Sequence, residues 1–84
     1  MASKVQKHMI AVAAKVGNIP LCCKLALMAS QEGGGYVYLP NALGLVEEVG
    51  ITAHQFAGGL SALAAKGEYK PTNDYFGRLI QEQQ

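Results

Sequence analysis

Glycines, which commonly end helices, divide this chain into short segments, and no linker separates one segment from the next. Gly17, Gly50 and Gly67 each follow an apolar segment, and three consecutive glycines at residues 33–35 follow another. The chain has 84 residues, whereas a usual domain holds roughly 100 to 150, so the segments supply one domain and no more. We therefore expect residues 1–84 to share a single core, and the order of the segments becomes the main guide to the fold.

The composition favours a folded protein without a membrane segment. Hydrophobic residues make up 50% of the chain and charged residues 15%, which is too apolar and too weakly charged for intrinsic disorder. No apolar run approaches the ~18 residues that cross a bilayer, and the N-terminus lacks a signal-peptide pattern. Cys22 and Cys23 are adjacent and cannot form an ordinary disulfide, which agrees with a reducing compartment. We expect a cytoplasmic protein, with one cysteine in the core and the other half-exposed.

Two helices are predicted in the first third of the chain. Four apolar residues at steps of four, three and four define the first helix: Val5, Met9, Val12 and Val16. With Ser3 as its N-cap and Gly17 as its stop, this helix spans residues 3–17. Residues 18–20 open a second helix, because Pro20 in a first turn costs no hydrogen bond. The apolar stripe of this second helix is formed by Leu21, Leu25 and Met28.

A short strand and a short helix follow the glycine run. Residues 36–39 are β-branched and aromatic and lie between the three glycines and Pro40, as expected of one strand. Asn41 is the predicted cap of a helix that carries Leu43, Leu45 and Val46. Gly50 ends this helix.

The next helix has the clearest signals in the chain. Thr52 begins it, and Gln55 three positions later completes a capping box. Lys66 and Gly67 end it. Its predicted buried face consists of Phe56, Gly59, Leu60 and Leu63.

A hairpin is predicted at the C-terminal end. Residues 68–71 and 75–80 have strand character, and Thr72, Asn73 and Asp74 supply the chemistry of a turn between them. The whole chain is therefore expected to be mostly α with a small β-sheet, an α+β fold.

This order of elements resembles the winged helix-turn-helix family of DNA-binding domains. The resemblance covers at least residues 19–80, and its most specific part is residues 45–52, LVEEVGIT, followed by Lys66-Gly67. In the family a glycine turn ends one helix, a branched residue closes the corner, Ser or Thr caps the recognition helix, and Lys-Gly opens the wing. The resemblance implies a helix-turn-helix at 41–66, a wing hairpin at 68–80 and an extra N-terminal helix. Short winged helices of this kind are typical of regulators from bacteria, plasmids, phages and archaeal viruses.

The resemblance also implies where DNA would bind. The outward positions of the recognition helix, usually Arg, Lys, Gln or Asn in the family, are here Ala53, His54, Ala57, Gly58 and Ser61. Only His54, Ser61 and the neighbouring Gln55 can read a base, so most of the affinity is expected from phosphate contacts. The complete predicted set is Thr52, His54, Gln55, Ser61, Lys66, Lys70, Thr72, Asn73, Arg78, Lys4 and Lys7.

Each of these residues also has an ordinary structural interpretation. His54 can be a plain exposed helix residue, Gln55 serves the capping box, and Thr72 and Asn73 form the turn. Lysines such as Lys4 can simply face solvent. The net charge of the chain is only +1. However, the first 31 residues carry four lysines and no acid, which is compatible with a polyanionic partner.

Other chemistries receive less support from the sequence. Two cysteines and two histidines meet the count of a zinc site but not its spacing, so we expect no metal. The serines, cysteines and histidines form no catalytic motif, and we expect neither an enzyme nor a cofactor. Tyr36 and Tyr38 share one face of a strand and could stack unpaired bases, although covering the helices is the simpler role.

The sequence therefore favours a small transcriptional regulator, a repressor in the simplest case, that binds duplex DNA. A homodimer is expected because one recognition helix reads about four base pairs, and Met9, Ile10 and Val12 on the first helix offer a surface for the second copy. The alternative is a winged-helix protein-interaction module that serves as an adaptor, an assembly factor or an inhibitor of a nucleic-acid machine. The weakly basic recognition helix favours this alternative, whereas the basic first third of the chain and the wing residues Lys70 and Arg78 favour DNA.

Overall fold

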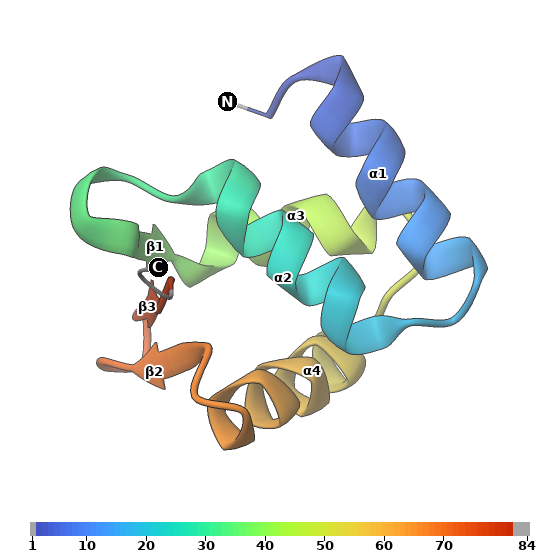
Figure 1. The fold of residues 1–84 in the computed structure, drawn as a ribbon. Helices are drawn as coiled ribbons and strands as arrows, with labels where there is room; N and C mark the ends of the chain where they lie inside the picture. Colours follow the sequence, from blue (N-terminus) through green and yellow to red (C-terminus); the bar gives the residue numbers. More distant parts are fainter. Residues whose placement is uncertain (1, 82–84) are drawn as a thin grey trace.

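The computed structural model describes residues 2–81 as four α-helices and a small three-stranded sheet (Figure 1). The elements are α1 (Lys4–Lys15), α2 (Ile19–Ser30), the 3-10 turn η1 (Gly33–Gly35), β1 (Tyr36–Tyr38), α3 (Leu39–Glu47), α4 (Ala53–Ala65), β2 (Tyr69–Pro71) and β3 (Phe76–Leu79). The predicted α+β class is confirmed, and the order of elements is compatible with a winged helix that carries an extra N-terminal helix. Among residues 2–81, no helix combines the length and hydropathy needed to cross a bilayer.

The sheet joins the middle of the chain to its C-terminal hairpin. All pairings are antiparallel in the order β1-β3-β2, so β3 lies between β1 and β2. Val37, Gly77, Tyr69 and Leu79 are buried toward the helices, and the alternate residues face solvent. Gly77 is needed in the central strand because a Cβ there would overlap the ring of Tyr69.

The hairpin turn is one residue longer than predicted. Tyr75, predicted as the first residue of the last strand, lies in the turn, and β3 begins at Phe76. The side-chain oxygen of Asn73 accepts hydrogen bonds from the backbone N–H groups of Tyr75 and Phe76 at 2.8 and 2.9 Å. Asn73 therefore forms the turn as expected. Because the N–H of Tyr75 is hydrogen-bonded to the Asn73 side chain, Tyr75 belongs to the turn and not to the sheet.

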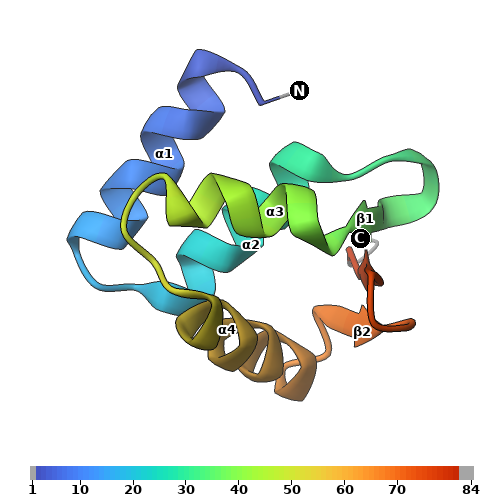
Figure 2. The ribbon, with the colours of Figure 1, turned by 180° about the vertical axis from the view of Figure 1, so that it is seen from behind.

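Helix α2 is the centre of the fold, with α1, α3 and α4 packed around it (Figures 1 and 2). Because neighbours cover α2 on several sides, Cys22 and Cys23 are both fully buried, and the prediction of one half-exposed cysteine is wrong. The Cys22 thiol donates to the carbonyl of Ile10 at 3.6 Å, and the Cys23 thiol donates to that of Phe56 at 3.9 Å. Burial raises the pKa of Cys22, and burial together with Cys22 raises the pKa of Cys23 to about 12.

The apolar stripes predicted for α1 and α2 are not the buried sides of these helices. The buried residues of α1 are Ile10 and Ala13, and those of α2 are Cys22, Cys23, Ala26 and Leu27. Small side chains at Ala13, Cys22, Cys23 and Ala26 allow the helices to approach closely around the buried Ile10 and Leu27, and several other large apolar residues remain outside. Those left exposed are Val5, Met9, Val12, Val16, Leu21 and Met28. Ile10, predicted as part of a dimer surface, therefore belongs to the core.

The helix boundaries follow the local signals with one exception. Ser3 caps α1, Asn18 caps α2 and Thr52 caps α4, each by accepting a backbone hydrogen bond. Asn41 does not cap α3, because this helix already begins at Leu39. The N–H of Leu39 donates to the carbonyl of Tyr75 at 2.8 Å, and Pro40 has no N–H to satisfy. The hairpin turn thus replaces a side-chain cap, a contact that local sequence does not reveal.

Candidate nucleic-acid interface

A tight turn joins α3 to α4 and sets the direction in which α4 leaves the core. Gly50 has φ +90°, a conformation that favours glycine, and the N–H of the buried Ile51 donates to the carbonyl of Val46 at 3.0 Å. Thr52 then starts α4. This is the predicted helix-turn-helix arrangement of a glycine turn, a branched corner residue and a capped second helix (Figure 2).

The inner side of α4 is packed tightly against α2. Phe56 and Leu63 are buried, Gly59 is buried between them, and Leu60 is half-buried, as the sequence predicted. A Cβ at Gly59 would overlap the sulfur of Cys23, so this glycine allows the two helices to approach. The orientation of α4 about its own axis is therefore set by buried contacts.

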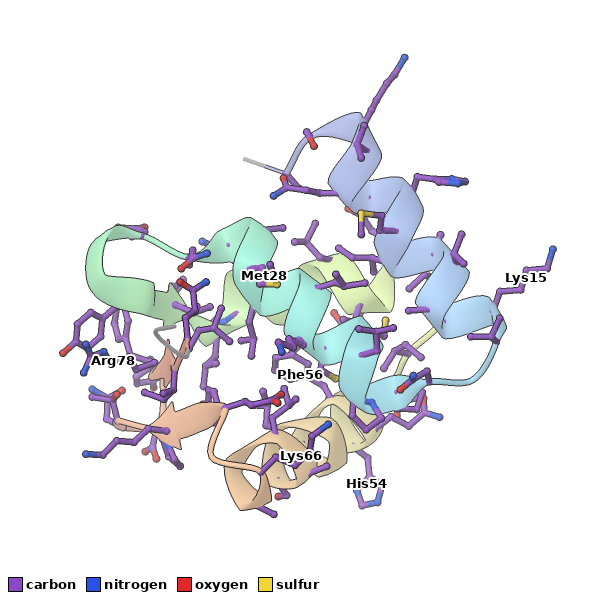
Figure 3. The ribbon with its side chains drawn as sticks, in the orientation of Figure 1. Lys15, Met28, His54, Phe56, Lys66 and Arg78 are labelled. Carbon is purple, nitrogen blue, oxygen red and sulfur yellow. The ribbon has the colours of Figure 1, made fainter. Side chains whose placement is uncertain are left out.

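The outer side of α4, which we call the α4 face, carries small residues and one histidine, with no Lys, Arg, Asp or Glu. It consists of Ala53, His54, Ala57, Gly58, Ser61 and Ala65, all exposed. Figure 3 shows His54 pointing away from α2, on the opposite side of the helix from Phe56. A Cβ added at Gly58 would meet no atom within 4 Å, so another molecule can come close to the helix backbone there.

Thr52 and Gln55 use some of their hydrogen-bonding groups in the capping box at the start of α4. The Thr52 hydroxyl accepts from the N–H of Gln55 at 3.0 Å, and the Gln55 side-chain oxygen accepts from the N–H of Thr52 at 2.9 Å. The predicted capping box is confirmed. The side-chain N–H₂ of Gln55 takes no part in it, so this exposed residue keeps two donors for a further partner.

Basic residues lie at the C-terminal end of α4 and, separately, on the outer face of the sheet. Lys66 is exposed at the end of α4, and Lys70 and Arg78 are paired across β2 and β3, so their side chains emerge on the same outer face. The Arg78 Nε donates to the carbonyl of Gly34 at 3.0 Å. Thr72 and Asn73 lie in the exposed turn beyond these strands.

The cations of α1 are not brought to the same place. Helix α1 packs on α2 and α3 and lies away from the sheet in both views of the ribbon (Figures 1 and 2). Lys7 lies 3.9 Å from Glu48 in an exposed ion pair, and Lys4 is exposed on the first turn. The structure thus groups His54, Ser61 and Lys66 on α4 and groups Lys70, Thr72 and Arg78 at the sheet, with Lys4 and Lys7 apart from both.

Two further surfaces were not fully visible in the sequence. The first, which we call the α1–α2 groove, is an apolar hollow of about 260 Å³ between the exposed sides of the two helices, lined by His8, Met9, Val12, Ala13, Val16, Leu21 and Leu25. The second lies on the outer face of the sheet, where Phe76 joins Tyr36 and Tyr38. The alternation of Phe76 and Arg78 along one strand hinted at this face, but only the pairing of β1 with β3 places the three rings together.

Within residues 2–81, no three His, Cys, Asp or Glu side chains gather in a way that could hold a metal ion. Comparison of the chain with protein-family models, curated proteins and solved structures found no match. A functional assignment therefore depends on the geometry and chemistry of the chain's own residues.

Proposed function

We propose that this protein binds duplex DNA through the α4 face and the β2–β3 hairpin, and that it acts as a small transcriptional regulator. The observation that carries the proposal is the exposed, acid-free outer side of α4, which follows a tight turn and is held rigidly from beneath by Phe56 and Gly59. A rigid exposed helix of this kind suits insertion into the major groove. Repression is the simplest outcome, since occupying a promoter requires no further surface.

Base contacts and phosphate contacts would come from different residues. His54, Ser61 and the free amide of Gln55 can hydrogen-bond to base edges, and Ala57 and Gly58 let the helix backbone approach the groove. Lys66 and the paired Lys70 and Arg78 supply positive charge for phosphates. Because few residues can contact bases and several cations can contact phosphates, we expect the affinity for DNA to depend strongly on salt and the preference for one DNA sequence to be modest.

We further propose a homodimer that covers the α1–α2 groove. Several large side chains of α1 and α2 are exposed together, among them Val16 at 71% and Met9 and Val12 at 47% each. Contiguous apolar surface on a small domain is typical of an interface. A two-fold dimer also doubles the DNA site, which one recognition helix alone leaves at about four base pairs.

The test is a fluorescence-anisotropy titration of duplex DNA from upstream of the protein's own gene, repeated over a salt series. The logarithm of affinity should fall with the logarithm of salt with a slope of about −0.9 per phosphate contacted. Lys70→Ala should flatten the slope by about one unit, whereas His54→Ala should reduce the preference for specific over random DNA and leave the slope unchanged. Lys15→Ala, an exposed lysine of α1 outside the proposed interface, serves as the control. Binding no tighter than that of a neutral control protein at low salt would reject the proposal.

The alternative function, a protein-interaction module acting as adaptor, assembly factor or inhibitor, has its own observation. The α4 face lacks Arg and Lys, and its small residues suit close packing against a partner helix better than base readout. Gly58→Leu separates the two functions. Under the alternative it abolishes partner binding by steric clash while duplex affinity, already negligible, stays unchanged.

A further inference from the structure

The outer face of the sheet is an aromatic surface with two cations, which we call the aromatic platform. Antiparallel pairing places Tyr36, Arg78 and Lys70 in one row across the three strands and Tyr38 and Phe76 in the next row. The three rings are exposed to the extent of 45% for Tyr36, 39% for Tyr38 and 41% for Phe76. Side chains in such rows emerge on the same face of a sheet.

The contacts within the platform hold its rings in place without covering them. The rings of Tyr38 and Phe76 are 5.3 Å apart between centroids and inclined by 51°. The Arg78 guanidinium carbon lies 5.3 Å from the centroid of Tyr36, and its Nε is hydrogen-bonded to Gly34. In Figure 3, Arg78 lies at the edge of the molecule, away from α2 and α4. The rings are thus positioned before any ligand arrives, which lowers the entropy cost of binding.

The charge of the platform identifies the kind of ligand that fits it. The residues of β1, β2 and β3 include Lys70 and Arg78 and no acid. A shallow cavity of about 260 Å³ lies beside Tyr36 and is lined by Tyr36, Lys70, Pro71, Thr72 and Arg78. Aromatic faces stack on unpaired bases, and neighbouring cations attract the phosphates that link those bases.

We infer that the aromatic platform binds single-stranded DNA, with bases stacked on Tyr36, Tyr38 and Phe76 and phosphates at Lys70 and Arg78. Duplex DNA does not fit this role, because its bases are already stacked and paired. Stacking on the rings and attraction to Lys70 and Arg78 need only bases and phosphates, so a deoxyribose backbone suffices, and comparison with oligouridine distinguishes DNA from RNA. This binding goes beyond the duplex contacts proposed for α4. It shares Lys70 and Arg78 with the proposed duplex site, so its test depends on the three rings, which the duplex proposal does not use.

The experiment measures binding of the intact chain to a labelled oligothymidine of about ten nucleotides, to the matching oligouridine and to a blunt duplex. Tyr36→Thr and Phe76→Thr keep β-forming residues at exposed positions, and each should weaken oligothymidine binding by roughly 5- to 100-fold. Tyr75→Thr is the matched control, since Tyr75 is an exposed tyrosine of the same hairpin outside both rows. His54→Ala, which addresses the α4 face, should leave oligothymidine binding unchanged.

Several outcomes would overturn the inference. One is oligothymidine binding that persists in both Thr variants when circular dichroism shows them folded, and another is binding that His54→Ala removes. If a Thr variant does not fold, Tyr36→Phe and Arg78→Lys replace it. Tyr36→Phe keeps an aromatic ring and should bind oligothymidine as tightly as the unmodified protein. Arg78→Lys loses the guanidinium that stacks on Tyr36 and should bind it more weakly. Tighter binding of oligouridine would assign the platform to RNA, and equal binding of an acidic peptide would reduce it to a charged surface.

Discussion

Helices α1 and α4 are similar in length and both begin with a capping box, yet they treat their large apolar residues in opposite ways. In α4, Phe56 and Leu63 are buried. In α1, Val5 and Val16 are 68% and 71% exposed, and only Ile10 and Ala13 reach the core. The difference separates two uses of an apolar stripe. One holds a helix to its own domain, and the other is the exposed surface that we propose for a second copy.

The largest expected effect compares Phe56 with Val12. Phe56→Ala removes a buried ring beneath the helix-turn-helix corner and should lower the free energy of unfolding by about 3 to 5 kcal/mol. Val12→Ala truncates an exposed side chain and should change it by less than about 0.5 kcal/mol at concentrations where the chain is monomeric. Urea denaturation of both variants measures the contrast. Equal losses would mean that α1 and α4 bury their apolar sides alike.

The two adjacent glycines of α4 give the next largest effect. Alanine at either position favours the helix by roughly 0.5 to 1 kcal/mol, and Gly58 has open space for the new methyl group. At Gly59 the methyl group would overlap the Cys23 sulfur, and such overpacking costs about 1 to 3 kcal/mol. Gly58→Ala should therefore stabilise the protein and Gly59→Ala should be less stable than it by about 1 to 3 kcal/mol.

A double-mutant cycle identifies the cause of the Gly59 effect. Cys23→Ala removes the sulfur that the new methyl group would overlap, so it should cost less in the Gly59→Ala background than in the unmodified protein. Thermal unfolding of the four proteins measures the coupling. Strict additivity would show that the close approach of α2 and α4 is not the reason for glycine at this position.

The exposed stripe of α1 yields a prediction about assembly. Met9→Asp places a charge in the α1–α2 groove and should raise the dimer dissociation constant at least tenfold, about 1.4 kcal/mol, while the monomer stays folded. Ala57→Asp, an equally drastic change on the exposed side of α4, should leave the dimer intact. Sedimentation across micromolar concentrations distinguishes the species. An unmodified protein that sediments only as a monomer would remove the dimer from the proposal.

Local signals predicted the elements of this fold better than they predicted its buried faces. Helix caps, glycine stops and the capping box depend only on residues close together in the sequence. The starts of α1, α2 and α4 were therefore predicted correctly. Which side of α1 or α2 is buried depends on what packs against it. Ile10, Cys22 and Cys23 are covered by other helices, and no periodicity within one segment reports those neighbours.

The candidate interface shows the same limit. The exposed positions of α4, including His54 and Ser61, were predictable because the capping box and Phe56 define the register of the helix. The row of Tyr36, Arg78 and Lys70 was not, because it requires β1 to pair with a strand far along the chain. Tyr38 and Phe76 are neighbours only because their strands pair. The alternation of residues along each strand shows which side chains share a face of that strand, but it does not show which strand lies next to it.

The smallest expected effect compares the two capping boxes, which are chemically alike. Ser3 accepts from the N–H of Gln6 at 3.1 Å, and Thr52 accepts from the N–H of Gln55 at 3.0 Å. Thr52→Ala should lower the free energy of unfolding by about 1 kcal/mol, because α4 cannot lose its first turn without disturbing Phe56. Ser3→Ala should lower it by only a few tenths, because the first turn of α1 is almost wholly exposed and can fray by itself. Hydrogen exchange locates the difference: the amides of Gln6 and Lys7, which donate to the Ser3 hydroxyl and carbonyl, should exchange faster in Ser3→Ala, whereas in Thr52→Ala protection should fall throughout the core. Equal losses of global stability would show that the N-terminal turn of α1 is as tightly coupled to the core as α4, and the contrast between the two helices would then be confined to their apolar residues.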